Sequence, residues 1–99
     1  MILKLYAVKQ DNAGNPVSHL TLQNKLLDSI GGYTRYEGIG FWKDENCIIY
    51  RDNLLVYEIV TNNYGNIADC IRVFTLWGLG DAKQKALFYT LDNEGHTII

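Results

Sequence analysis

The stretch from Gly31 to Thr61 constrains the fold of this chain most strongly, because it has the pattern of one long β-hairpin. It opens on a glycine pair, which is typical of the C-terminal end of a helix. Residues 33–43 follow and are rich in aromatic side chains, which predicts a strand. Glycines inside a strand mark a bulge, a bend or the close approach of another backbone or a ligand. The polar residues 44–46 are predicted to form the turn of the hairpin.

The returning strand of the hairpin is predicted in two parts. Residues 47–50 return along the first strand, and the nearly continuous apolar run at residues 54–61 is expected of a central strand covered on both faces. The polar residues Arg51, Asp52 and Asn53 lie between the two parts. We expect them to form an irregularity before the central strand.

The hairpin is preceded by a strand and a helix. Residues 2–9 alternate, with Leu3, Leu5 and Ala7 on one face, as in a strand with one buried side. Residues 18–30 have a helical apolar stripe, with Ser18 as the predicted N-cap. His19 falls in the first turn of that helix, and we expect it to be exposed.

A second helix and two short strands follow the hairpin. Residues 62–66 open the helix, residues 78–81 end it, and residues 84–91 read as a strand. Residues 92–95 form a predicted turn into a closing strand at residues 96–99. The order β-α-β-β-α-β with an extra C-terminal hairpin strand predicts an α+β, ferredoxin-like sandwich, built as a single domain over residues 1–99.

Charge and composition exclude several classes of protein. The net charge is −2 and the nine Lys and Arg residues are dispersed, so nucleic-acid binding is disfavoured. The N-terminal segment is too short and too polar for a signal peptide or a membrane span, and we expect a cytoplasmic protein. Two His, two Cys and the absence of a nucleophile beside a base predict no metal site, no cofactor and no catalytic residues.

A sheet with both helices on one face leaves its other face open. Tyr6, Val8, Val56 and Phe88 are expected on that face, depending on the register. Exposed apolar faces are commonly covered by a second copy, so we predict a homo-oligomer, either a dimer or a trimer. The twelve aromatic residues exceed what a small core holds, which favours a partner surface or a ligand groove.

Five residues of the hairpin are candidate ligand-binding residues: Tyr36, Glu37, Trp42, Asp52 and Glu58. The rings can stack on a planar, nucleotide-like ligand or can form an oligomer interface, which is the favoured alternative. A carboxylate within an apolar strand must be paired, lie at an edge, or face an interface or site.

Each of the three carboxylates also has a structural alternative. Glu58 would lie at a sheet margin or in an ion pair across an oligomer interface. Asp52 would be a turn-forming residue that bonds its own backbone. Glu37 would pair across strands on the solvated face that it shares with Arg35.

Short motifs are similar to those of a small, uncharacterised ferredoxin-like family of bacteria and phages. They are Gly32-x-Thr34, then Gly38-x-Gly40-x-Trp42, then an acidic residue, here Asp52, just before the central strand. The resemblance covers nearly the whole chain. It implies the same fold and no settled activity.

A second, weaker resemblance is to small phage proteins related to S-adenosylmethionine lyases. It rests on Tyr36-x-Gly38, on Asp52 and on the segment from Gln84 to Asp92. The resemblance implies a trimer, a fold like that of PII signal proteins, and a ligand between subunits.

Two functional hypotheses follow. The favoured one is a non-catalytic, oligomeric small-ligand or protein-binding protein of phage or bacterial origin. The alternative is an enzyme acting on S-adenosylmethionine or a related nucleotide between subunits. There Tyr36 or Trp42 would stack on the base, and Asp52 or Glu58 would orient the cation. In that group the terminal strand tends to begin Gln-Glu, and Lys85 stands in the place of the acid here.

Overall fold

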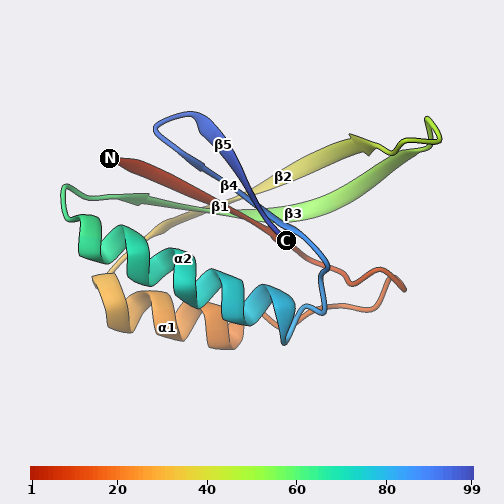
Figure 1. The fold of residues 1–99 in the computed structure, drawn as a ribbon. Helices are drawn as coiled ribbons and strands as arrows, with labels where there is room; N and C mark the ends of the chain where they lie inside the picture. Colours follow the sequence, from red (N-terminus) through yellow and green to blue (C-terminus); the bar gives the residue numbers. More distant parts are fainter.

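Five strands form one antiparallel sheet with two helices on one of its faces (Figure 1). The computed structural model describes all of residues 1–99. Its elements are β1 (Ile2–Val8), α1 (Leu20–Ile30), β2 (Thr34–Lys43), β3 (Ile49–Val60), α2 (Tyr64–Leu79), β4 (Leu87–Leu91) and β5 (Glu94–Ile98). The strand order is β2-β3-β1-β4-β5, so β1 is central and β2 and β5 are the edges. The predicted α+β class is confirmed.

The core lies between the sheet and the helices. Leu3, Leu5 and Ala7 of β1 are fully buried, which confirms the face predicted from their alternation. Leu5 is opposite Tyr57 of β3 in the register, and Tyr57 is buried on the same face. Burial of each such leucine stabilises the fold by roughly 1.5–3 kcal/mol.

The N-cap of helix α1 lies one residue later than predicted. Ser18 is not the N-cap, because that position belongs to His19, whose side chain makes no capping bond. The Ser18 hydroxyl instead accepts a hydrogen bond from the Leu20 N–H at 3.3 Å. The predicted C-terminal end is confirmed: Gly31 adopts a left-handed φ of 78° and donates its N–H to the Leu27 carbonyl at 2.8 Å.

The strand β3 is continuous from Ile49, and the predicted irregularity at residues 51–53 is wrong. Asp52 lies opposite Gly40, and Asn53 lies opposite Ile39, in an unbroken ladder with β2. The outer half of this hairpin extends past the helices, as Figure 1 shows. Polar residues are tolerated there because neither face packs on a helix.

The C-terminal hairpin is tighter than predicted. Strand β4 begins at Leu87 rather than at residue 84, and β5 begins at Glu94 rather than at residue 96. The two-residue turn is Asp92-Asn93, with φ values of 49° and 68°. Positive φ at both central positions is the geometry of a type I′ turn, which matches the twist of the strands it joins.

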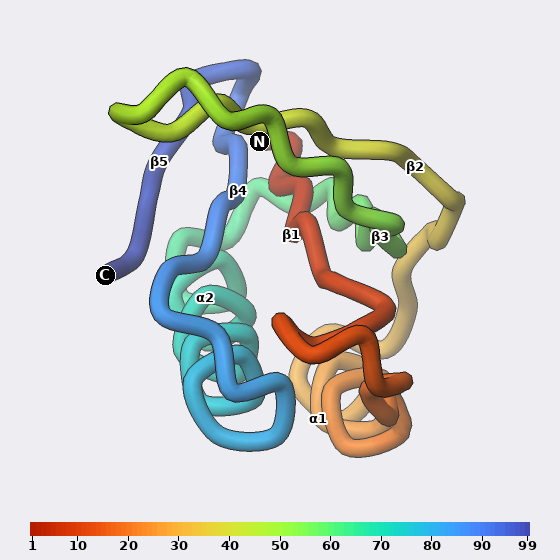
Figure 2. Tube along the Cα trace, turned by 90° about the vertical axis from the view of Figure 1, so that its right-hand side faces the viewer, coloured from red at the N-terminus to blue at the C-terminus, as the bar shows by residue number.

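The twist of the sheet carries the outer part of the β2–β3 hairpin across its open face. Seen along the sheet in Figure 2, the hairpin crosses above β1 and β4 toward β5, and both helices lie on the opposite side. The open face of the sheet is therefore not flat.

Candidate functional site

The register places the expected apolar residues on the open face. Tyr6 of β1 lies opposite Val56 of β3 on one side and Phe88 of β4 on the other. Val56 is only 3% exposed although it faces away from the helices. The open face is thus partly covered within one chain, which weakens the argument that a second copy must cover it.

A hollow of about 640 Å³ lies on this face, between the outer part of the β2–β3 hairpin and strands β4 and β5. This volume is in the range of sites for small molecules. Its lining comes from all five strands, from the β2–β3 turn, and from the segments before β4 and after β1: Tyr6, Val8, Asn12, Trp42, Asp44, Tyr50, Asp52, Leu54, Gln84, Lys85, Ala86, Leu87, Phe88 and Thr97.

Aromatic rings from three strands meet at the hollow. The ring centroids of Tyr6 and Phe88 are 5.3 Å apart with the planes tilted by 50°. Trp42 approaches Phe88 edge-on, with centroids 6.5 Å apart. These tilted arrangements are favourable for aromatic pairs and leave ring surface directed at the space between the strands.

Asp52 and Trp42 form the polar centre of the hollow. The Trp42 indole Nε1–H donates to Asp52 Oδ2, diagonally across the β2–β3 ladder. Gly40 lies directly opposite Asp52, and a Cβ atom there would stand 3.1 Å from both the Trp42 ring and Leu54. Glycine at this position therefore lets the indole lie over the strand and reach the carboxylate.

Asp44 stabilises the β2–β3 turn beside the hollow. Its Oδ1 accepts the backbone N–H groups of Asn46 and Ile48, both at 2.9 Å, and its Oδ2 accepts the Tyr50 hydroxyl at 3.1 Å. The bond from the Ile48 N–H is the main reason that the pKa of Asp44 is lowered. Its carboxylate in turn raises the pKa of Tyr50. Asp44 thus fixes the turn and the Tyr50 ring rather than offering a free carboxylate.

Charge in the hollow is mixed. Lys85 lies in its lining, and its ammonium group makes no ion pair. Of the two carboxylates, Asp52 retains an oxygen, Oδ1, with no hydrogen bond from the chain. The hollow therefore presents one unused acceptor and one unused cation beside aromatic surface.

Two of the five predicted site residues line this hollow, and three do not. Trp42 and Asp52 are brought together. Glu58 lies on the same face but pairs with Lys4, directly opposite in β1, at 3.8 Å. Tyr36 is on the open face opposite Val56, outside the lining. Glu37 is on the helix-facing side.

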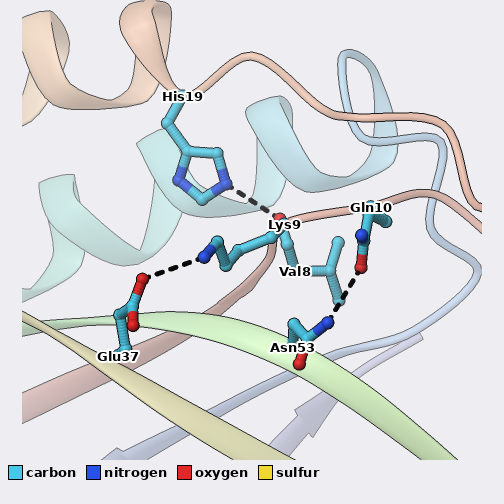
Figure 3. Close-up of polar contacts among 6 residues, drawn as sticks. All are labelled: Val8, Lys9, Gln10, His19, Glu37 and Asn53. Atoms are coloured by element: carbon cyan, nitrogen blue, oxygen red, sulfur yellow. Dashed lines mark hydrogen bonds and ion pairs between the residues drawn. The ribbon is translucent and has the colours of Figure 1, made fainter.

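Glu37 belongs to a separate set of contacts at the end of β1. Its carboxylate binds the Lys9 ammonium at 3.0 Å, and this bond is the main reason that the pKa of Glu37 is lowered. The Gln10 side chain accepts a hydrogen bond from Asn53 at 3.3 Å. Figure 3 shows these bonds and the bond from His19 joining the chain after β1 to β2, β3 and the start of α1.

His19 is buried, so its predicted exposure is wrong. Its Nε2 lies 2.8 Å from the Val8 carbonyl oxygen, and its Nδ1 lies 2.8 Å from the Tyr57 hydroxyl. Because a carbonyl only accepts, Nε2 carries the proton and Nδ1 accepts from Tyr57. Gln23 donates to the same hydroxyl at 3.0 Å, which completes the network. Burial lowers the pKa of His19 and keeps the ring neutral.

The aromatic residues of the hairpin do not form one surface. Tyr57 is in the core with Tyr33 packed edge-on against it, at a centroid separation of 5.1 Å. Phe41 is on the helix-facing side of the hairpin, opposite to Trp42. Sequence reasoning did not identify Lys85 or Asp44 as members of the hollow, because only the twist of the sheet brings them near Trp42.

No group of three or more His, Cys, Asp or Glu side chains is placed to hold a metal ion. None of the helices combines the length and the apolar character needed to cross a membrane. Comparisons with models of protein families, with curated proteins and with solved structures found no match to this chain.

Proposed function

We propose that this chain is a non-catalytic, homo-oligomeric binding protein of bacterial or phage origin that holds a small planar ligand in the hollow on its open sheet face. The observation that carries the proposal is the Trp42–Asp52 pair, which lines a hollow of about 640 Å³ together with the rings of Tyr6 and Phe88. The hypothesis also includes a protein partner that binds to the same surface in place of a small ligand.

The ferredoxin-like assignment belongs to the same proposal. The order β2-β3-β1-β4, with each neighbour antiparallel and a helix after β1 and after β3, supports a ferredoxin-like sandwich. The position of β5 beside β4 supports an extra hairpin strand at the edge.

The chemistry of the lining defines the class of ligand. Aromatic faces favour a flat ring, and they attract a cation placed near them. The free oxygen of Asp52 accepts from an amino group or faces a positive charge, and Lys85 suits an anionic group at the margin. A nitrogen-rich planar ring with a charged substituent, such as a nucleotide-like molecule, meets these conditions.

The enzymatic alternative uses the same hollow. S-adenosylmethionine has an adenine ring for Trp42 and a sulfonium for the Asp52 carboxylate, and this fit is what favours it. Glu58, the other carboxylate considered, is already paired with Lys4. Lys85 places a cation in the lining, which opposes the approach of a sulfonium.

The proposal is tested by titrating the purified chain with S-adenosylmethionine and with adenosine monophosphate, following both heat and tryptophan fluorescence. We expect saturable binding with quenching of Trp42, whose ring is partly exposed, while Trp77 stays buried. Because the negative charge that attracts the sulfonium is lost, Asp52→Asn should weaken binding of S-adenosylmethionine about 10- to 100-fold.

Glu58→Gln is the matched control, because Glu58 lies on the same strand and face but outside the hollow. It should leave binding unchanged. Equal effects of the two variants, or no binding of either probe, would contradict the proposal. Consumption of S-adenosylmethionine by the wild type but not by Asp52→Asn would replace it with the enzymatic alternative.

A further inference from the structure

We infer that β2 pairs with the β2 strand of a second copy of this chain, so that two five-stranded sheets join edge to edge. The inference rests on the oligomeric part of the proposed function and is independent of the ligand. It is carried by the exposure of this edge and by the self-complementary order of its side chains.

Strand β2 is a long free edge. It pairs only with β3 and has ten residues, none of them proline. No strand is hydrogen-bonded to its outer side. The unpaired backbone N–H and C=O groups of such a strand are a template for a further strand. The other edge strand, β5, has only five residues and therefore offers fewer unpaired backbone groups.

The outer half of the hairpin also has an uncovered apolar surface. Ile39 and Phe41 of β2 are 54% and 64% exposed, and Ile49 of β3 is 67% exposed. All three lie on the helix-facing side, but the helices end before this part of the hairpin (Figure 1). Adjacent exposed apolar side chains are a feature of interaction surfaces.

An antiparallel pair of β2 strands with its two-fold axis at Gly40 gives four of the five side chains on this face a complementary partner; Arg35 falls outside the paired segment. Ile39 then lies opposite Phe41 of the second copy, and Glu37 lies opposite Lys43. By symmetry each contact occurs twice, so an apolar cluster is flanked by two ion pairs.

Other axes match the strand less well. An axis at Ile39 places Arg35 opposite Lys43, which is a pair of like charges. An axis at Tyr36 pairs Arg35 with Glu37 but leaves Ile39 outside the paired segment. Charge and apolar complementarity together therefore select Gly40.

Sedimentation velocity of the full chain over a concentration series tests the pairing. We expect a dimer for the wild type and a monomer for Phe41→Glu, which places carboxylates in the apolar cluster. Phe41 is exposed in the single chain, so the fold should survive, and circular dichroism checks this. Ile48→Glu is the matched control: Ile48 is an exposed apolar residue at the hairpin turn, outside the paired segment, and its change should have no effect.

The register is tested by exchanging charges. Glu37→Lys and Lys43→Glu should each weaken the dimer about 3- to 30-fold, because two cross-strand pairs change from attraction to repulsion. The double variant should restore the affinity. Lys9→Ala, which removes only the ion pair within one chain, should not weaken the dimer.

Each outcome decides a separate point. A wild type that stays monomeric overturns both this inference and the oligomeric part of the proposed function. A trimer, or an oligomer that persists unchanged in Phe41→Glu, overturns the β2 pairing but not oligomerisation. Ligand binding by a monomer leaves the hollow intact as a site.

Discussion

His19 is the residue on which the junction between the sheet and α1 depends most. Its two nitrogens are both used, one by the Val8 carbonyl and one by the Tyr57 hydroxyl, each at 2.8 Å. Its ring also lies edge-on to Trp77, with centroids 4.9 Å apart. One neutral imidazole thus joins β1, β3 and the two helices.

The stability of the fold should therefore depend on the protonation of His19. Burial lowers the pKa of His19 from 6.5, so the folded chain binds fewer protons than the unfolded chain near that pH. Its stabilisation is complete above pH 6.5 and is lost as the pH falls through the lower folded pKa. Urea unfolding at pH 7.5 and 5.5 should show this loss.

His19→Gln should reduce this pH dependence and lower stability at pH 7.5 by about 1–3 kcal/mol, since it disrupts buried hydrogen bonds. His96→Gln is the control, because His96 is exposed and stacked on Tyr89. A pH profile that is unchanged by His19→Gln would show that His19 does not set it.

The two cysteines should react very differently. Cys47 is exposed, whereas Cys70 is buried in α2 and burial raises the pKa of its thiol to about 11. The thiolate is the reactive form. We expect a thiol reagent at pH 8 to modify one cysteine, Cys47, in the folded chain and both in denaturant. Rapid modification of Cys70 without denaturant would contradict the packing of α2.

For single residues, sequence patterns predicted which side chains belong to the site better than they predicted whether a side chain is buried. The proximity of Trp42 and Asp52 could be predicted, because both are candidate site residues on the two strands of one hairpin. The burial of His19 was not, because its partner Tyr57 is 38 residues away in the chain. No local pattern distinguishes a histidine at a helix start from one that fills a tertiary network.

At the scale of elements, the contact between α2 and β4 is unusually close. A Cβ atom on Gly78 would lie 2.3 Å from a methyl carbon of Leu87. Gly78→Ala should therefore destabilise the fold by about 1–3 kcal/mol, despite the higher helix propensity of alanine. Denaturant unfolding measures this difference.

Gly32→Ala is the matched control for that prediction, because nothing lies within 4 Å of a Cβ atom there. It should change the free energy of unfolding by no more than about 0.5 kcal/mol. A Gly78→Ala variant as stable as Gly32→Ala would mean that α2 and β4 are less closely packed than described.

The number and type of elements could be predicted, but several boundaries could not. Alternation in β1 reflects burial of one face on the helices, and the apolar run in β3 reflects burial on both faces, so both patterns were visible in the sequence. Residues 51–53 extend past the helices, where polar side chains are allowed in a strand. The apolar pattern therefore covers only the inner part of β3 and does not mark where the strand begins.

At the scale of the whole molecule, the twist of the sheet decides where function can lie. It brings the outer part of the β2–β3 hairpin over the open face and forms the hollow that holds Trp42, Asp52 and Lys85. The same projection exposes the edge of β2. The proposed ligand binding and the proposed pairing of two chains thus use different surfaces of one hairpin.

The location of the hollow could be predicted only in part. The open face and its residues Tyr6 and Phe88 followed from strand order, but the hollow depends on twist, which has no residue pattern of its own. For that reason the sequence does not separate Glu58 and Tyr36 from Asp52, although only Asp52 of the three lines the hollow.

Native mass spectrometry of the freshly purified chain tests ligand binding and pairing in one experiment, because it reports a retained ligand and the number of chains together. We expect a dimer whose wild type and Glu58→Gln variant carry a nucleotide-sized adduct that Asp52→Asn loses. Bare chains in all three, or an adduct that Asp52→Asn retains in full, would contradict it.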